Sequence, residues 1–344
     1  MNSQLKLTIS LVTDMKTIPS YFCGASLKRI GRSIANSGLV LALALGIPIA
    51  AAAADIRQSL YIGKTFSTPE EAVAELVAAA RAEDTNAFRV IFGPVGVEIE
   101  NPDRVQAANE LETFNALVIQ QQRIAHESDS KCVLEIGTNS WPFPVPIVKR
   151  NGQWFFDTEA GKDEILNRHI GKNELSTLQS VRAYADAQRE YANKDHDGDL
   201  VLEYAQKFNS TPGMKDGLYW PADLDGEISP LGPLVAEAQE QGYGKRTRKQ
   251  GDEPIPFHGY FFKILTRQGK HAPGGKYDYV INGNMIGGFA LVAWPAEYGR
   301  SGIMTFIVNQ QGRVYQKDLG PKTGRLAADM KAYDPDPAWN VSPD

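Results

Sequence analysis

The stretch Val148-Lys149-Arg150-Asn151-Gly152-Gln153-Trp154-Phe155 indicates a strand, a turn and a second strand. Asn-Gly between two apolar runs is a strong hairpin signal, because both residues tolerate a positive φ. We therefore predict strands over Val145–Val148 and Trp154–Phe156. Another strand is expected over Cys132–Ile136, where apolar and polar residues alternate.

Two helices are predicted upstream of these strands. The first begins at Thr68-Pro69-Glu70-Glu71: Thr68 caps the helix, Pro69 suits its first turn, and Glu71 completes a capping box. The second begins after Asn101-Pro102. Their apolar stripes are Ala72, Val73, Leu76, Val77 and Ala80 in the first helix, and Val105, Ala108, Leu111, Phe114 and Val118 in the second. Helices followed by an antiparallel meander are typical of an α+β domain, which we place at residues 55–170.

A second α+β domain is predicted at residues 171–326. A short helix over Asp163–Ile170 is expected to connect the two domains, and a longer helix over Lys172–Ala192 to open the second. Loops then dominate as far as Pro233. The remaining predicted elements are a helix over Leu234–Gln241 and strands over Gly259–Thr266, Gly288–Trp294 and Met304–Val308. The predicted fold class is thus α+β, with two domains that each pack helices on a small antiparallel sheet.

The two ends of the chain are predicted to lie outside these domains. Residues 327–344 are expected to form a loosely held tail, because Asp334-Pro335-Asp336-Pro337 favours extended backbone. Residues 1–54 have the pattern of a signal peptide: a basic flank, the apolar run Ser37–Ala50 and four alanines before Asp55. Met15 is an alternative start. We expect cleavage near Ala54, a periplasmic or secreted protein, and no membrane span in the mature chain.

Charge and cysteine content restrict the possible partners. The chain has 36 basic and 41 acidic residues, a net charge of −5. Removal of residues 1–54 takes away five basic residues and one acidic residue, which leaves 31 and 40 and a net charge of −9. Such an acidic protein is a poor candidate for nucleic acid. Its one mature cysteine, Cys132, is interpreted as a small buried residue and not as a nucleophile.

An acidic loop follows the predicted helix over Lys172–Ala192. Asn193, Asp195, Asp197 and Asp199 alternate around a glycine, as oxygen ligands do in loops of the EF-hand kind. The closing carboxylate, Glu203, comes one position early. Calcium is therefore a possible ligand at Asn193, Asp195, Asp197, Asp199 and Glu203, and an ordinary Asp-rich turn is the alternative.

Candidate ligand-binding residues are Asp216, Tyr219, Trp220 and His258. Loop aromatics can stack on sugar rings or pack against a partner, although a large aromatic is more often part of its own core. His258 lies among aromatic residues and glycines, so a general base is conceivable there, with a structural histidine as the alternative. The five histidines form no zinc-binding pattern.

Three resemblances follow from these segments. The layout of the first domain, with the run Val148–Phe155, is similar to the cone-shaped nuclear-transport-factor-2-like folds. Residues 175–319 resemble the heads of type IV pilins and pseudopilins, through Glu203-Tyr204-Ala205, Gly242-Tyr243-Gly244 and Gly259-Tyr260-Phe261-Phe262. A soluble domain precedes the helix here, so the resemblance implies only the head architecture and not pilus assembly.

The chain as a whole is similar to a bacterial family known as domain of unknown function 2950. That resemblance rests on Asp216-Gly217-Leu218-Tyr219-Trp220-Pro221, Ser229-Pro230-Leu231-Gly232-Pro233 and Phe257-His258-Gly259-Tyr260. It implies no activity.

Three functions are compatible with the sequence. The first is a non-catalytic envelope protein that binds a protein or polymer through loops of the second domain. The second is a cell-wall-directed hydrolase or transferase, which requires His258, Asp216 and Tyr219 to converge. The third is a calcium-stabilised glycan-binding protein, which requires Trp220 to be exposed beside Asp195.

Overall fold

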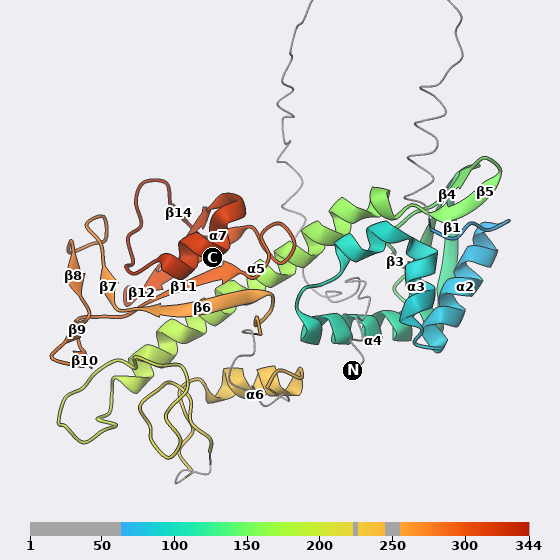
Figure 1. Ribbon diagram of the computed structural model, residues 1–344. Coiled ribbons are helices and arrows are strands. Elements are labelled where there is room, and N and C mark those ends of the chain that lie inside the picture. The colour runs from blue at the N-terminus through green and yellow to red at the C-terminus, as the bar shows by residue number, and fades with distance from the viewer. Residues whose placement is uncertain (1–62, 223–225, 245–254, 344) are drawn as a thin grey trace, which may run out of the picture.

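The computed structural model describes residues 63–222, 226–244 and 255–343 (Figure 1). The predicted signal peptide lies outside these residues. Within them, no helix is both long and apolar enough to cross a membrane.

The chain is α+β, as predicted, and its first half packs helices on an antiparallel sheet. The helices are α2 (Pro69–Arg81), α3 (Thr85–Phe92) and α4 (Arg104–Gln120), with a 3-10 turn, η1 (Pro94–Ile99), before α4. The predicted cap is present, because Thr68 Oγ1 accepts from the Glu71 amide at 3.1 Å. α3 and η1 were not predicted.

The first sheet has the strand order β1-β2-β4-β5, with all pairs antiparallel. Its strands are β1 (Gln122–Ser128), β2 (Lys131–Ile136), β3 (Trp141–Pro142), β4 (Ile147–Arg150) and β5 (Gln153–Phe156). The Asn-Gly turn links β4 and β5, and Asn151 and Gly152 both have positive φ, 52° and 81°. At the far edge Phe66 pairs with Trp154 of β5, whereas β1 pairs only with β2 among the described strands.

One continuous helix, α5 (Thr158–Tyr191), replaces the two helices predicted over 163–170 and 172–192. Its 34 residues correspond to about 51 Å of helix. The prediction was wrong at Gly171, because an isolated exposed glycine is tolerated inside a helix at a cost of about 1 kcal/mol. Early residues of α5 such as Ile165 join the first core, and later ones such as Tyr184 join the second.

The second sheet has the order β14-β13-β12-β11-β6. Its strands are β6 (Tyr260–Leu265), β11 (Ala290–Pro295), β12 (Met304–Asn309), β13 (Tyr315–Asp318) and β14 (Asn340–Val341). The three predicted strands are confirmed to within two residues at each end. Two short hairpins stand beside the sheet, β7 (Arg267–Gln268) with β8 (Tyr277–Asp278) and β9 (Val280–Ile281) with β10 (Asn284–Met285). Two helices, α6 (Gly232–Glu240) and α7 (Thr323–Asp329), complete the second half, with a 3-10 turn, η2 (Gly320–Lys322), before α7.

The C-terminal segment is packed against the second sheet, so the prediction of a loosely held tail was wrong. Tyr333 is fully buried, and β14 pairs with β13. Asp336-Pro337 begins a turn closed by the Trp339 amide on the Asp336 carbonyl at 2.9 Å, and Tyr333 and Trp339 supply apolar surface that holds the segment in place.

Candidate functional site

The acidic loop follows the end of α5. Asp195, Asp197 and Asp199 each offer a carboxylate oxygen, and these oxygens lie within 4.8 Å of one another. Asp195 accepts backbone hydrogen bonds from Gly198 at 2.7 Å and from Leu200 at 2.9 Å. These bonds lower the pKa of Asp195 below its ordinary value. Three clustered carboxylates on a tight turn fit the oxygen ligands that calcium prefers.

The other two predicted calcium ligands lie differently. Glu203 Oε2 accepts from the Met285 amide at 2.9 Å, so this carboxylate holds the loop against β10. Asp199 Oδ2 is also tied to that hairpin, accepting from Asn284 Nδ2 at 2.6 Å. Asn193 is exposed directly after α5. The clustered set is therefore Asp195, Asp197 and Asp199.

Trp220 is part of the core. Its exposed fraction is 2%, its Nε1 donates to the Glu227 carbonyl at 3.1 Å, and its ring lies 5.4 Å from that of His196. The exposure that the glycan-binding hypothesis required of Trp220 is thus absent. The reason is physical, because a tryptophan beside Leu218 and Tyr191 buries more apolar surface inside than it could in solvent.

Asp216 and Tyr219 belong to the same loop but have other surroundings. Asp216 accepts from Thr211 through both its amide (2.7 Å) and its hydroxyl (2.8 Å) and pairs with Lys207. Although burial alone would raise the pKa of Asp216, the hydrogen bonds from Lys207 and Thr211 lower it to about 2. Tyr219 is half-buried and packs against the second core.

His258 lies in a buried polar cluster instead. Its amide donates to Tyr243 Oη at 3.2 Å, and Tyr243 Oη donates to Asp103 Oδ2 at 2.6 Å. The Gly259 amide also donates to Asp103, at 3.1 Å. Burial raises the pKa of Asp103 and lowers that of His258 to about 4. No contact among the described residues joins His258 to Asp216 or Tyr219.

The cluster continues along α4 and α5. Glu110 is 1% exposed, and its Oε2 lies 3.3 Å from His169 Nε2 and 3.1 Å from Asn101 Nδ2. Asn173 connects the two halves, since Gln106 Nε2 donates to its Oδ1 at 2.9 Å and its Nδ2 donates to the Ser301 carbonyl at 2.9 Å. This cluster was missed from the sequence. Its only local signal was polar residues on the inner faces of helices.

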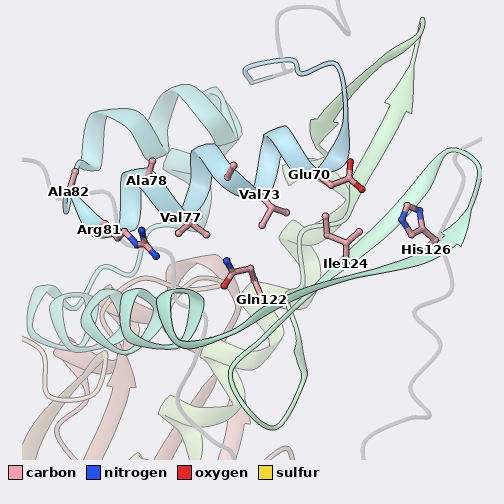
Figure 2. A pocket seen from close by; sticks show the side chains of 10 residues that line it. Glu70, Val73, Val77, Ala78, Arg81, Ala82, Gln122, Ile124 and His126 are labelled. Atoms are coloured by element: carbon pink, nitrogen blue, oxygen red, sulfur yellow. The ribbon is translucent and has the colours of Figure 1, made fainter.

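An open groove of about 950 Å³ runs between α2 and β1 (Figure 2). One wall is a stripe of α2 at helical spacing, and the other is one face of β1, where alternate residues point the same way. In Figure 2 the side chains from α2 face those from β1 across the groove. The lining residues are Glu70, Val73, Ala74, Val77, Ala78, Arg81 and Ala82 from α2 and its C-cap, and Gln122, Ile124 and His126 from β1.

The groove is apolar along its middle and charged at its ends. Arg81 stands at one end, and Glu70 and His126 stand at the other (Figure 2). Neither Glu70 nor Arg81 has an ion-pair partner in the part of the chain that the structure describes. The long axis from Glu70 to Arg81 covers eleven helical steps, about 17 Å.

Cys132 lies beneath the Glu70 end. It is 0% exposed, as predicted for a small buried residue, and its Sγ is 3.2 Å from His126 Nδ1. Burial and the charges of Glu70 and Glu127 raise the pKa of the thiol, which disfavours the nucleophilic thiolate. The sequence could not show that His126 lies opposite Cys132, because this depends on the register of β1 on β2.

The fold is α+β, and an open groove lies beside a sheet edge. Residues 63–341 match the family model described as "Protein of unknown function (DUF2950)", and the chain belongs to that family. No curated protein and no solved structure matches the chain. The resemblances to pilin heads and to nuclear-transport-factor-2-like folds therefore stay predictions.

Proposed function

We propose that this protein is an exported, non-catalytic binding protein that holds its ligand in the groove between α2 and β1. The observation that carries the proposal is the groove itself, about 17 Å long, in which Ala74 and Ala78 of the helix stripe are exposed and Ile124 of the strand face is half-buried. Its volume lies in the range of ligand-binding sites.

The surroundings of the titratable groups favour binding over catalysis. The Cys132 thiol is held neutral, and Asp103 and Glu110 accept hydrogen bonds from fixed protein groups. Trp220 and Asp216, which the sequence suggested as binding residues, make contacts within the protein. This moves the proposed ligand site from the second half to the first.

Export and the division into two domains belong to the same proposal. The pattern of residues 1–54 supports export, with the periplasm or full secretion as destination. The two hydrophobic cores, one on each sheet, support two domains that meet along α5. An envelope protein or polymer remains the proposed class of partner.

The groove can be tested with anilinonaphthalene sulfonate, a dye that binds exposed apolar surface. Ala78 is exposed and lines the groove, so Ala78→Trp fills it without disturbing the core. Ala236→Trp makes the same change at an exposed position of α6 and is the matched control. We expect Ala78→Trp to weaken dye binding about tenfold, equivalent to about 1.4 kcal/mol of lost contact. Equal binding by both variants would exclude the groove as the ligand site.

Calcium binding by the acidic loop is a second candidate function, favoured by the close approach of three carboxylates. We expect calcium to raise the melting temperature of the purified protein, because a ligand that binds only the folded state stabilises it. Asp195→Ala should abolish the rise, with magnesium as the control ion. If the melting temperature is the same in calcium and in chelator, the loop is an ordinary turn.

A further inference from the structure

We propose that the ligand of the groove is an extended polypeptide segment that adds as a strand to the free edge of β1. This inference rests on the proposed function and specifies the chemical class of the ligand. Three features carry it: an unpaired strand edge, a match in length, and charges at the two ends of the groove.

The edge of β1 offers backbone hydrogen bonds. β1 pairs with β2 on one side only, and no described strand lies on its other side. Along seven residues of β1 the outward amides and carbonyls are open to a partner, and they match the backbone of another strand. A small apolar molecule would leave these groups unused.

The length of the groove suits a short strand. The distance of about 17 Å between Glu70 and Arg81 equals about five residues of extended chain. Alternate side chains of such a strand would face Val73, Val77 and Ile124, while the others face solvent. Because a strand has period two, apolar residues at every second position are expected.

The charges at the two ends of the groove predict the charges at the two ends of the bound segment. Arg81 lies toward the beginning of β1, and Glu70 lies toward its end beside His126 (Figure 2). A segment antiparallel to β1 would place its N-terminal end at Glu70 and its C-terminal end at Arg81. We therefore assign a basic group to its N-terminal end and a carboxylate to its C-terminal end.

Two other occupants are less compatible with the structure. Residues 63–68, which precede α2, lie at the opposite edge of the sheet, where Phe66 pairs with Trp154 of β5. A second copy could pair β1 with β1, but α2 flanks this edge and would meet the α2 of the other copy. Dimerisation is measured by light scattering as a control.

The test begins with a displayed library of random heptapeptides selected on the purified protein. We expect enriched peptides with apolar residues at alternate positions, a basic N-terminal residue and an acidic C-terminal residue. Binding of the best peptide, measured by fluorescence anisotropy, should weaken about tenfold in Ala78→Trp and in Arg81→Glu and stay unchanged in Ala236→Trp.

N-methylated versions of that peptide separate strand addition from other modes. Methyl groups on one alternate set of amides should weaken binding about tenfold, and on the other set less than twofold, because only every second amide of a strand faces its neighbour. Equal effects of both sets would overturn strand addition. So would enrichment of no peptide, or a concentration-dependent dimer that excludes the peptide. Equal dye binding by Ala78→Trp and Ala236→Trp is a separate result, since only that outcome contradicts the groove as a ligand site.

Discussion

His169 is buried on α5 with its Nε2 beside Glu110, and His258 is half-buried beside Tyr243. Sequence reasoning identified His258 as a notable residue but grouped it with Asp216 and Tyr219. The actual neighbours are Asp103 and Tyr243, which are 155 and 15 residues away in sequence. Single residues such as Cys132 could be classified from local pattern. Clusters formed by distant segments could not, because they depend on how the two halves dock.

His169 and His258, whose pKa values are both lowered, predict acid sensitivity. Burial, with the charges of Lys172 and Arg300, lowers the pKa of His169 to about 3, and burial lowers that of His258 to about 4. The unfolded chain takes up these protons near pH 6.5, and the folded chain does not. Their contribution to stability is therefore complete above about pH 6.5 and is lost as the pH falls toward the folded values. The raised pKa of Asp103 has the opposite effect on stability near pH 4. There the folded chain holds the Asp103 proton more tightly than the unfolded chain, so this group adds stability as the pH falls.

This prediction is checked by urea unfolding between pH 7 and pH 4.5. His169→Asn should reduce the dependence of the unfolding free energy on pH by up to about 1.4 kcal/mol per pH unit. Ala236→Trp, a change of a non-titrating residue at an exposed position, is the control and should keep the full dependence. Identical pH profiles for His169→Asn and the wild type would show that His169 is not held neutral.

Among the elements, α5 differs most from its prediction. Both predicted helices, over 163–170 and 172–192, lie within α5, but the chain was divided between them at Gly171 where the structure has one continuous helix. Three strands of each sheet were predicted to within two residues, since alternation and Asn-Gly are local signals. No bounds were predicted for the other strands, which include β1 at the edge of the first sheet. The order and pairing of the strands were not predictable, because register depends on contacts between segments far apart in sequence.

Two glycines of α5 give a matched pair of variants. A Cβ at exposed Gly171 would meet no atom within 4 Å, whereas at Gly161 it would lie 2.8 Å from the Pro144 carbonyl oxygen. We expect Gly171→Ala to stabilise the protein by about 0.5–1 kcal/mol, because alanine favours a helix. Gly161→Ala should destabilise it through this steric overlap. Melting temperatures measure both changes, and a lower value for Gly171→Ala would contradict a continuous helix.

On the scale of the whole molecule, two cores share one helix and are joined by a buried polar cluster. α5 runs past both sheets in Figure 1, and Asn173 at its middle contacts α4 and the loop before β12. The α+β class could be predicted from the order of helices and strands. The groove could not, because it requires α2 to lie beside the edge strand of a sheet whose strand order was unknown.

β1 is an edge strand of the first sheet and β6 is an edge strand of the second, and the groove lined by α2 lies beside β1. The most direct test of strand addition is hydrogen–deuterium exchange with and without the selected peptide. We predict that those amides of residues 122–128 that point away from β2 exchange at least about tenfold more slowly with peptide bound, while residues 260–265 stay unchanged. Unchanged exchange at β1 with the peptide bound, or equal slowing at β6, would contradict the account.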